Sequence, residues 1–96
     1  MNKNIDILQF IPTGKENAIT REELVRLTGL CDRVNRKLIA RARRFSPIIN
    51  TSEGVGYYKP TEKSEVIEFL NQETHRARSI FWSIKGCRDW LKNHGK

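Results

Sequence analysis

The sequence predicts a mainly α-helical fold with a small β-hairpin and a long C-terminal helix. Three observations predict this class. Apolar residues recur at helical spacing in four segments, one stretch between two prolines is rich in β-favouring residues and glycine, and the last third of the chain contains no proline. The chain of 96 residues has the length of one domain with an appendage. We expect the domain at residues 1–60 and the appended helix at 61–96.

A short first helix is predicted over residues 4–11. Three aliphatic residues in this segment lie on one side of the predicted helix. Asn4 could cap the helix at its N-terminus, and Pro12 would end it. The following residues are expected to form a loop, with a very short strand at Ala18–Ile19.

The next two helices are predicted from their capping signals. Thr20 and Glu23 have the spacing of a capping box, and Gly29 suits the left-handed conformation that ends a helix. Asp32 is then the expected N-cap of a helix that runs to about Arg44. The two helices are separated by a short Thr-Gly-Leu turn.

The stretch after these helices predicts a β-hairpin. Residues 48–51 and 55–59 favour strands, and Ser-Glu-Gly lies between them. Pro47 and Pro60 stand at the outer ends, where a missing amide disturbs the strand pairing least. From about residue 61 or 64 the chain is expected to form one long helix, with Gly86 as its weak point. This order of elements is that of a winged helix-turn-helix domain with a C-terminal extension.

The predicted helix after Asp32 concentrates positive charge on one face. The chain has a net charge of +7, and residues 31–46 and 75–96 each contribute +5. In projection, one arc of the helix is mainly apolar, and the opposite side carries almost only Arg and Lys. The members of the apolar arc are Val34, Asn35, Leu38, Ile39, Ala42 and Phe45. Such a charge distribution is typical of proteins that bind an anionic partner.

This charged helix is the candidate for contact with double-stranded DNA. A helix fits the major groove with its N-terminal residues near base edges. Contacts to bases are therefore expected from Arg33, Arg36 and Lys37. Contacts to phosphates are expected from Thr20, Arg21, Arg41, Arg43 and Arg44.

Asn35 does not fit the apolar arc in which it falls. Burial of an unpaired amide costs about 1–3 kcal/mol. Its side chain is therefore expected either to bond the neighbouring turn or to face the groove, where asparagine reads adenine. The sequence leaves both alternatives open.

The stretches AITREELVRLTGLCDRVNRKLIARARR and PIINTSEGVGYYKP resemble the small winged-helix proteins of bacteria and their phages. The resemblance covers roughly residues 5–60 and implies double-stranded DNA binding, with the hairpin as the wing. In those proteins an apolar residue is usual at the position of Asn35, and serine is usual at Cys31. The hairpin tip carries Glu53 and no cation, so this wing is expected to brace the fold through Tyr57 or Tyr58, or to contact a protein.

The C-terminal helix carries an apolar seam spaced alternately by four and three residues, with Glu73 as its one polar member. We expect homodimerisation through this seam. A break near Gly86, folding back over the domain and binding of a different protein are the alternatives. The predicted interface consists of Val66, Leu70, Ala77, Ile80, Ile84, Cys87 and Leu91.

Other functional classes lack sequence support. Cys31 and Cys87 form no cluster with metal-ligand spacing, and no carboxylate pair, Cys/His set or phosphate loop suggests an enzyme. No metal, cofactor or small-molecule ligand is expected.

No signal peptide or membrane span is evident, which predicts a cytoplasmic, nucleoid-associated protein. The expected function is that of a small transcriptional regulator. The alternative is a protein-interaction adaptor in a phage replication, packaging or transcription complex.

Overall fold

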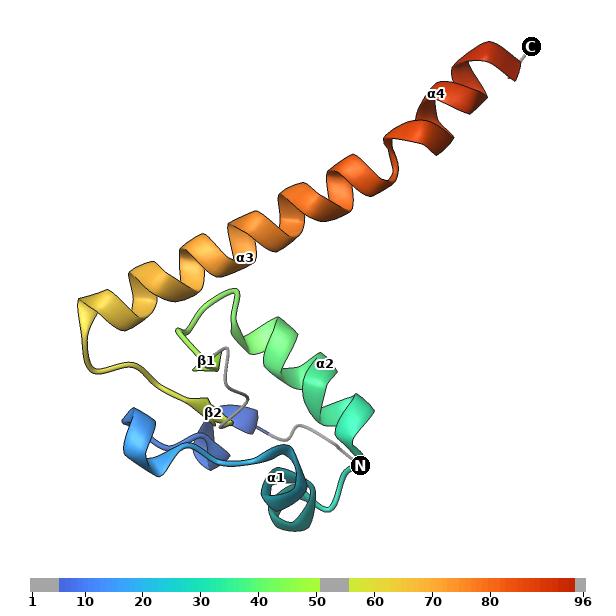
Figure 1. Ribbon diagram of the computed structural model, residues 1–96. Coiled ribbons are helices and arrows are strands. Elements are labelled where there is room, and N and C mark those ends of the chain that lie inside the picture. Colours follow the sequence, from blue (N-terminus) through green and yellow to red (C-terminus); the bar gives the residue numbers. More distant parts are fainter. Residues whose placement is uncertain (1–5, 51–55, 95–96) are drawn as a thin grey trace.

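The computed structural model describes residues 6–50 and 56–94. Over these residues the protein is mainly helical, with a two-stranded antiparallel sheet and a long C-terminal helical segment (Figure 1), which confirms the predicted class. Two 3₁₀ helices come first, η1 (Ile7–Phe10) and η2 (Lys15–Asn17). The other elements are α1 (Arg21–Thr28), α2 (Asp32–Ala42), β1 (Ile49–Asn50), β2 (Tyr57–Tyr58), α3 (Lys63–Ser83) and α4 (Lys85–His94).

The first helix is shorter and tighter than predicted. The 3₁₀ helix η1 is capped by Asp6, whose Oδ1 accepts a backbone hydrogen bond at 3.1 Å. Asn4, the predicted cap, lies outside the described residues. The helix ends before Ile11, which is extended, because a proline disfavours the α conformation of the residue that precedes it, and Pro12 follows.

Helix α1 begins and ends as predicted. The Thr20 hydroxyl accepts a hydrogen bond from the Glu23 amide at 3.1 Å, and the Glu23 carboxylate accepts one from the Thr20 amide at 2.9 Å. At the other end, Gly29 has a φ of 76° and donates its amide to the Val25 carbonyl at 2.9 Å. Both ends are therefore set by local hydrogen bonds.

Helix α2 begins one residue earlier than predicted. Cys31 is the N-cap, with extended backbone, and Asp32 is the first residue of the helix. The prediction that Asp32 caps the helix is wrong, because Arg21 and Arg36 bind its carboxylate. Asp32 still lies at the positive end of the helix dipole, which favours an acidic residue.

The C-terminal end of α2 also differs from the prediction. The helix ends at Ala42, and the next turn tightens through a hydrogen bond from the Arg44 amide to the Arg41 carbonyl at 3.1 Å. Phe45 lies beyond the helix and is 88% exposed, so its assignment to the buried apolar arc is wrong.

The predicted hairpin is present as an antiparallel pair of two-residue strands, shorter than expected. Ile19 joins it through an isolated bridge with Tyr57, in which each amide donates to the other's carbonyl at 2.9 Å. This bridge corresponds to the very short strand predicted there. Gly56 lies against Ile19 with a φ of 133°, and a Cβ atom at this position would lie 2.3 Å from the Ile19 carbonyl oxygen. The hairpin tip, with Glu53, lies outside the described residues.

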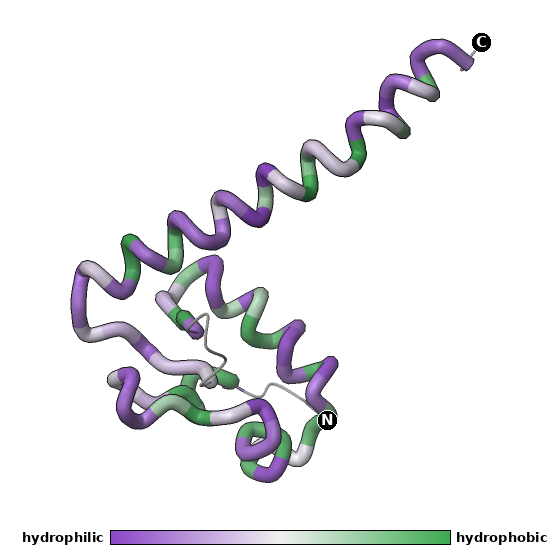
Figure 2. Tube along the Cα trace, in the orientation of Figure 1, coloured by the Kyte–Doolittle hydropathy of each residue, from purple (hydrophilic) through white to green (hydrophobic). Residues whose placement is uncertain are grey.

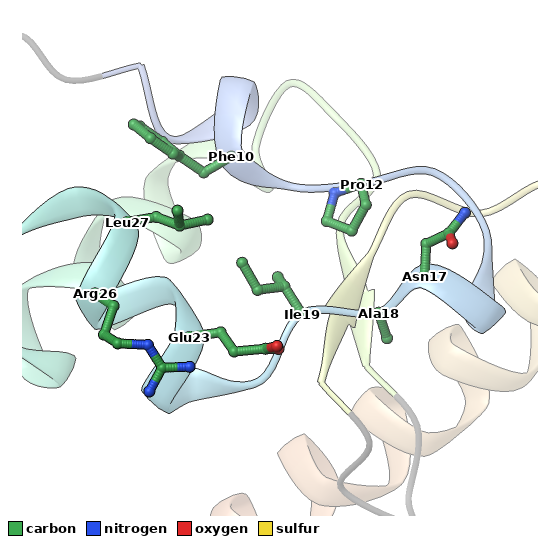
Figure 3. A pocket seen from close by; sticks show the side chains of 8 residues that line it. All are labelled: Phe10, Pro12, Asn17, Ala18, Ile19, Glu23, Arg26 and Leu27. Atoms are coloured by element: carbon green, nitrogen blue, oxygen red, sulfur yellow. The ribbon is translucent and has the colours of Figure 1, made fainter.

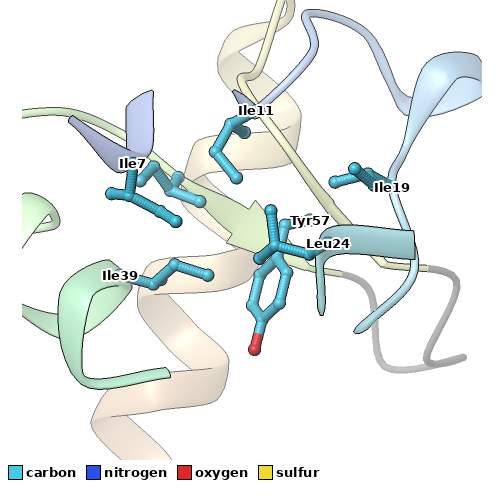
Figure 4. Packing of buried hydrophobic residues seen from close by; sticks show 7 residues of the cluster. Ile7, Ile11, Ile19, Leu24, Ile39 and Tyr57 are labelled. Atoms are coloured by element: carbon cyan, nitrogen blue, oxygen red, sulfur yellow. The ribbon is translucent and has the colours of Figure 1, made fainter. Parts of the chain in front are cut away.

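A small core joins α1, α2, η1 and the sheet (Figure 4). Leu24 and Ile39 are each 1% exposed, and Ile48 is equally buried beside the sheet. The two tyrosines of β2 are buried, as expected for a hairpin that braces the fold. The face of α2 that carries Ile39 is thereby fixed inward, and its opposite face points to solvent.

The C-terminal segment is two helices rather than one. Helix α3 ends at Ser83, and Ile84, with a φ of −96° and a ψ of −2°, separates it from α4. The first turns of α3 lie beside β1, and the remainder runs away from the domain (Figure 1). Apolar residues recur along this projecting part (Figure 2). The break near Gly86 was one of the predicted alternatives, whereas the helix does not fold back. No helix in the described ranges is long and apolar enough to cross a membrane.

Candidate nucleic-acid interface

One face of α2 and the turn after it is exposed and almost entirely cationic. The residues of this face lie at positions i, i+3, i+4, i+7, i+8 and i+11, counted from Arg33, and such positions form one stripe along a helix. All six are exposed, and Ala40 is the one member without a positive charge. We call the five cations the basic face: Arg33, Arg36, Lys37, Arg41 and Arg44. The three residues predicted to contact bases all belong to its N-terminal half.

A single carboxylate organises one edge of this face. Asp32 accepts two hydrogen bonds from Arg21, at 2.9 Å from Nε and 2.6 Å from Nη2. Arg36 Nε lies 3.1 Å from the same carboxylate. Asp32 thus links α1 to α2 and fixes the direction of Arg36, a role that the sequence analysis missed. Within the described ranges, no acidic side chain pairs with the remaining members of the basic face.

These ion pairs shift pKa values in opposite directions. The hydrogen bonds from Arg21 hold the pKa of Asp32 below its ordinary value, and the same bonds raise the pKa of Arg21. The negative charge of Asp32 partly neutralises Arg21 and Arg36, which reduces the attraction of these two arginines for a polyanion. Arg33, Lys37, Arg41 and Arg44 carry the unbalanced charge of the face.

We call the ion pairs of Asp32 with Arg21 and Arg36 the Asp32 clamp, and we expect the clamp to make the protein less stable at acid pH. Because the pKa of Asp32 is lower in the folded protein than in the unfolded chain, its contribution is complete above about pH 4 and disappears as the pH falls through the folded value. Urea unfolding followed by circular dichroism should show wild type to be more stable than Asp32→Asn at pH 7. The difference should shrink as the pH falls below about 4 and the Asp32 carboxyl becomes protonated. A constant difference across this range would contradict the clamp.

Arg43 points inward, although the sequence predicted a phosphate contact for it. Its Nε donates to the Ile48 carbonyl at 2.8 Å, and its Nη2 donates to Asn50 Oδ1 at 3.0 Å. The guanidinium carbon lies 5.0 Å from the ring centroid of Phe69 on α3 and 5.9 Å from that of Tyr57. Desolvation by burial lowers the pKa of Arg43. Arg43 therefore joins α2, β1 and α3, and it is not part of the basic face.

Thr20 is also engaged within the fold. A phosphate contact was predicted for Thr20, but its backbone amide, which could donate to a phosphate, already donates to the Glu23 carboxylate. The hydrogen bonds from Thr20 lower the pKa of Glu23, so this carboxylate stays ionised at neutral pH. Thr20 thus caps α1 and offers no free amide to a ligand.

Asn35 is buried and holds the turn between α1 and α2. It is 1% exposed, its Oδ1 accepts from the Thr28 hydroxyl at 3.1 Å and its Nδ2 donates to the Leu30 carbonyl at 3.2 Å. The single hydroxyl hydrogen of Thr28 is shared between Asn35 Oδ1 and the Leu24 carbonyl, and the hydroxyl oxygen accepts from the Leu30 amide. Of the two alternatives that the sequence left open, the structure selects the one in which Asn35 bonds the turn. These hydrogen bonds hold α2, which carries the basic face, in a fixed orientation relative to α1.

Outside the basic face, the described residues form an apolar groove beside α1 and present two cysteine thiols. No group of three His, Cys, Asp or Glu residues within residues 6–50 and 56–94 could hold a metal ion. A groove of about 430 Å³ beside α1 is lined mainly by apolar residues and by Glu23 and Arg26 (Figure 3). Because the Glu23 carboxylate is bound within the capping box, the groove contains no free acid–base pair. Both cysteines are exposed and unpaired thiols.

The comparisons with known proteins place no further constraint on this site. Neither protein-family models, nor curated proteins, nor solved structures give a significant match to the chain.

Proposed function

We propose that the protein binds double-stranded DNA as a winged helix-turn-helix regulator, with α2 in the major groove and the hairpin as the wing. The observation that carries this proposal is the exposed stripe of five cations on α2 and the turn after it, opposite a face that is fixed in the core. A helix of this width fits the major groove, and cations along its flanks neutralise phosphates.

The residues of the basic face have different expected roles. Arg33 and Lys37 lie in the first turns of α2, where side chains reach base edges. Arg36 shares the carboxylate of Asp32 with Arg21, which pre-orients its guanidinium for a bidentate contact with guanine. Arg41 and Arg44 lie toward the C-terminal end and are expected to contact phosphates. Arg43 points inward, away from the basic face, and its hydrogen bonds hold the end of α2 against β1.

Titration of the protein with a random-sequence DNA duplex tests the proposal. Binding should be detectable by fluorescence anisotropy at about 50 mM salt and should weaken strongly toward about 200 mM. With about three to five phosphates neutralised, the slope of the log–log plot is expected to be about −2.7 to −4.5. Absence of binding at the lower salt concentration would refute DNA binding.

A selection from random duplexes would then define the preferred sequence. A consensus centred on one major-groove segment is the expected result for a helix that reads base edges. Binding without any preference would restrict the role of α2 to phosphate contacts.

A further inference from the structure

A free apolar face lies on the projecting part of α3 and at the break before α4. Ala77, Ile80, Phe81 and Ile84 line an apolar groove of about 300 Å³. Their spacing is i, i+3, i+4 and i+7, which is the spacing of the four residues that form the hole for one side chain of a packed neighbouring helix. The groove therefore has the shape that receives a helix rather than a small polar ligand.

The same face supplies both halves of such a contact. Ala77 is small and leaves the hollow, while Ile80 and Phe81 project beside it with exposed fractions of 58% and 64%. A symmetric pair of identical helices would place a large side chain of each chain in the hollow of the other. We propose that a second copy of this chain packs on this face, independently of any binding to DNA.

The structure also limits where the contact begins. In the first half of the predicted seam, Val66 and Glu73 are partly buried on the part of α3 that lies beside β1, while Leu70 between them is 57% exposed. Glu73, the one polar member of the predicted seam, is paired with Arg76 at 3.6 Å. The seam from Ala77 to Leu91 is exposed and contains no charged residue. We therefore assign the interface to this second half of the predicted seam.

The available area is sufficient for a specific but modest dimer. Leu91, near the end of the seam, is 61% exposed, and Ile84 in its centre is 43% exposed. Mutual covering of this stripe by two copies would remove on the order of 1,000 Å² from water, near the lower limit of specific interfaces. A dimer that dissociates at micromolar concentration is the expected result.

Sedimentation equilibrium of the full chain without DNA tests the proposal. Wild type should be a dimer at tens of micromolar, and Ile84→Glu should raise the dissociation constant by at least about a hundredfold, because it buries an unpaired charge. Trp82→Glu is the matched control. Trp82 is 70% exposed, more than Ile84, but it lies about 200° around the helix from that residue. The control should remain dimeric.

Cross-linking locates the contact without disturbing the seam by a charge. In a Cys31→Ser, Cys87→Ser background, Ile84→Cys should form an intermolecular disulfide under mild oxidation. Ile84 lines the groove at the end of α3, so its two copies meet in a parallel symmetric pair and also in an antiparallel pair that crosses at this residue. Ser79→Cys, an exposed position off the stripe, should not cross-link at the same protein concentration.

Three outcomes would overturn the proposal. The first is a wild-type monomer at about 100 µM, well above the dissociation constants of modest interfaces. The second is an equal loss of dimer in Ile84→Glu and Trp82→Glu, which would indicate non-specific apolar association. The third is a monomer that floats with anionic vesicles through this helix, which would identify a lipid surface as the occupant. Circular dichroism of each variant excludes unfolding as the cause.

Discussion

Replacement of Lys37 and Arg41 by glutamate lowers the affinity for duplex DNA by at least about a hundredfold near 100 mM salt, where phosphate contacts dominate binding. Both residues are exposed, and within the described residues neither side chain forms an ion pair or a hydrogen bond, so the fold does not depend on them. The double change removes two phosphate or base contacts and places two anions in their positions. Anisotropy titration with one labelled duplex measures the effect.

A matched control separates the basic face from the overall charge of the protein. Lys63→Glu with Arg78→Glu changes the net charge by the same amount, but on α3, where both residues are exposed. This variant should lose far less affinity. Equal losses in the two double variants would show that net charge alone attracts DNA and would refute docking through α2. If both variants bind as wild type does, DNA binding through this domain is refuted as well.

Replacement of Asn35 by alanine destabilises the fold by about 1–3 kcal/mol, because it leaves the Leu30 carbonyl and the Thr28 hydroxyl with fewer partners in a buried turn. For a chain of this size, each 1 kcal/mol corresponds to a fall in melting temperature of about 4–8 °C. Thermal unfolding by circular dichroism measures the fall. The sequence preference in DNA binding, determined well below the melting temperature, should remain unchanged.

Asn71→Ala provides the control for this prediction. Asn71 is an exposed asparagine within α3, and alanine has the higher helix propensity, so stability should be unchanged or slightly increased. A double-mutant cycle with Thr28→Val should then reveal coupling between Asn35 and Thr28, which share a hydrogen bond. An Asn35→Ala protein of unchanged stability but altered DNA preference would reverse the assignment and place this residue at the groove.

The features predictable from the sequence are those that neighbouring residues determine. The capping box of α1 and the left-handed Gly29 depend on residues within one helical turn, and both are present. The basic face follows from helical periodicity, since a charged stripe opposite an apolar stripe has one stable orientation. The side chains of Arg33, Arg36 and Lys37 are consequently exposed where the pattern placed them.

The features that the sequence did not predict depend on segments that meet only after folding. Arg43 is the clearest example, because its projection beside other cations indicated a solvent role. Its partners include Tyr57 in β2 and Phe69 on α3, which are distant along the chain. Periodicity shows which side of a helix a residue occupies, but it does not show which neighbour covers that side.

The sequence by itself determined the mainly helical class, the order of α1, α2 and the hairpin, the helix caps of α1 and the charge of α2, because these depend on short-range hydrogen bonds and on the period of the apolar pattern. Only the tertiary structure decided that Asn35 lies inside, that Asp32 joins α1 to α2, and that the C-terminal apolar face is free beyond Ala77. The physical reason is that burial, ion pairing and exposure are set by the surfaces that folding brings together.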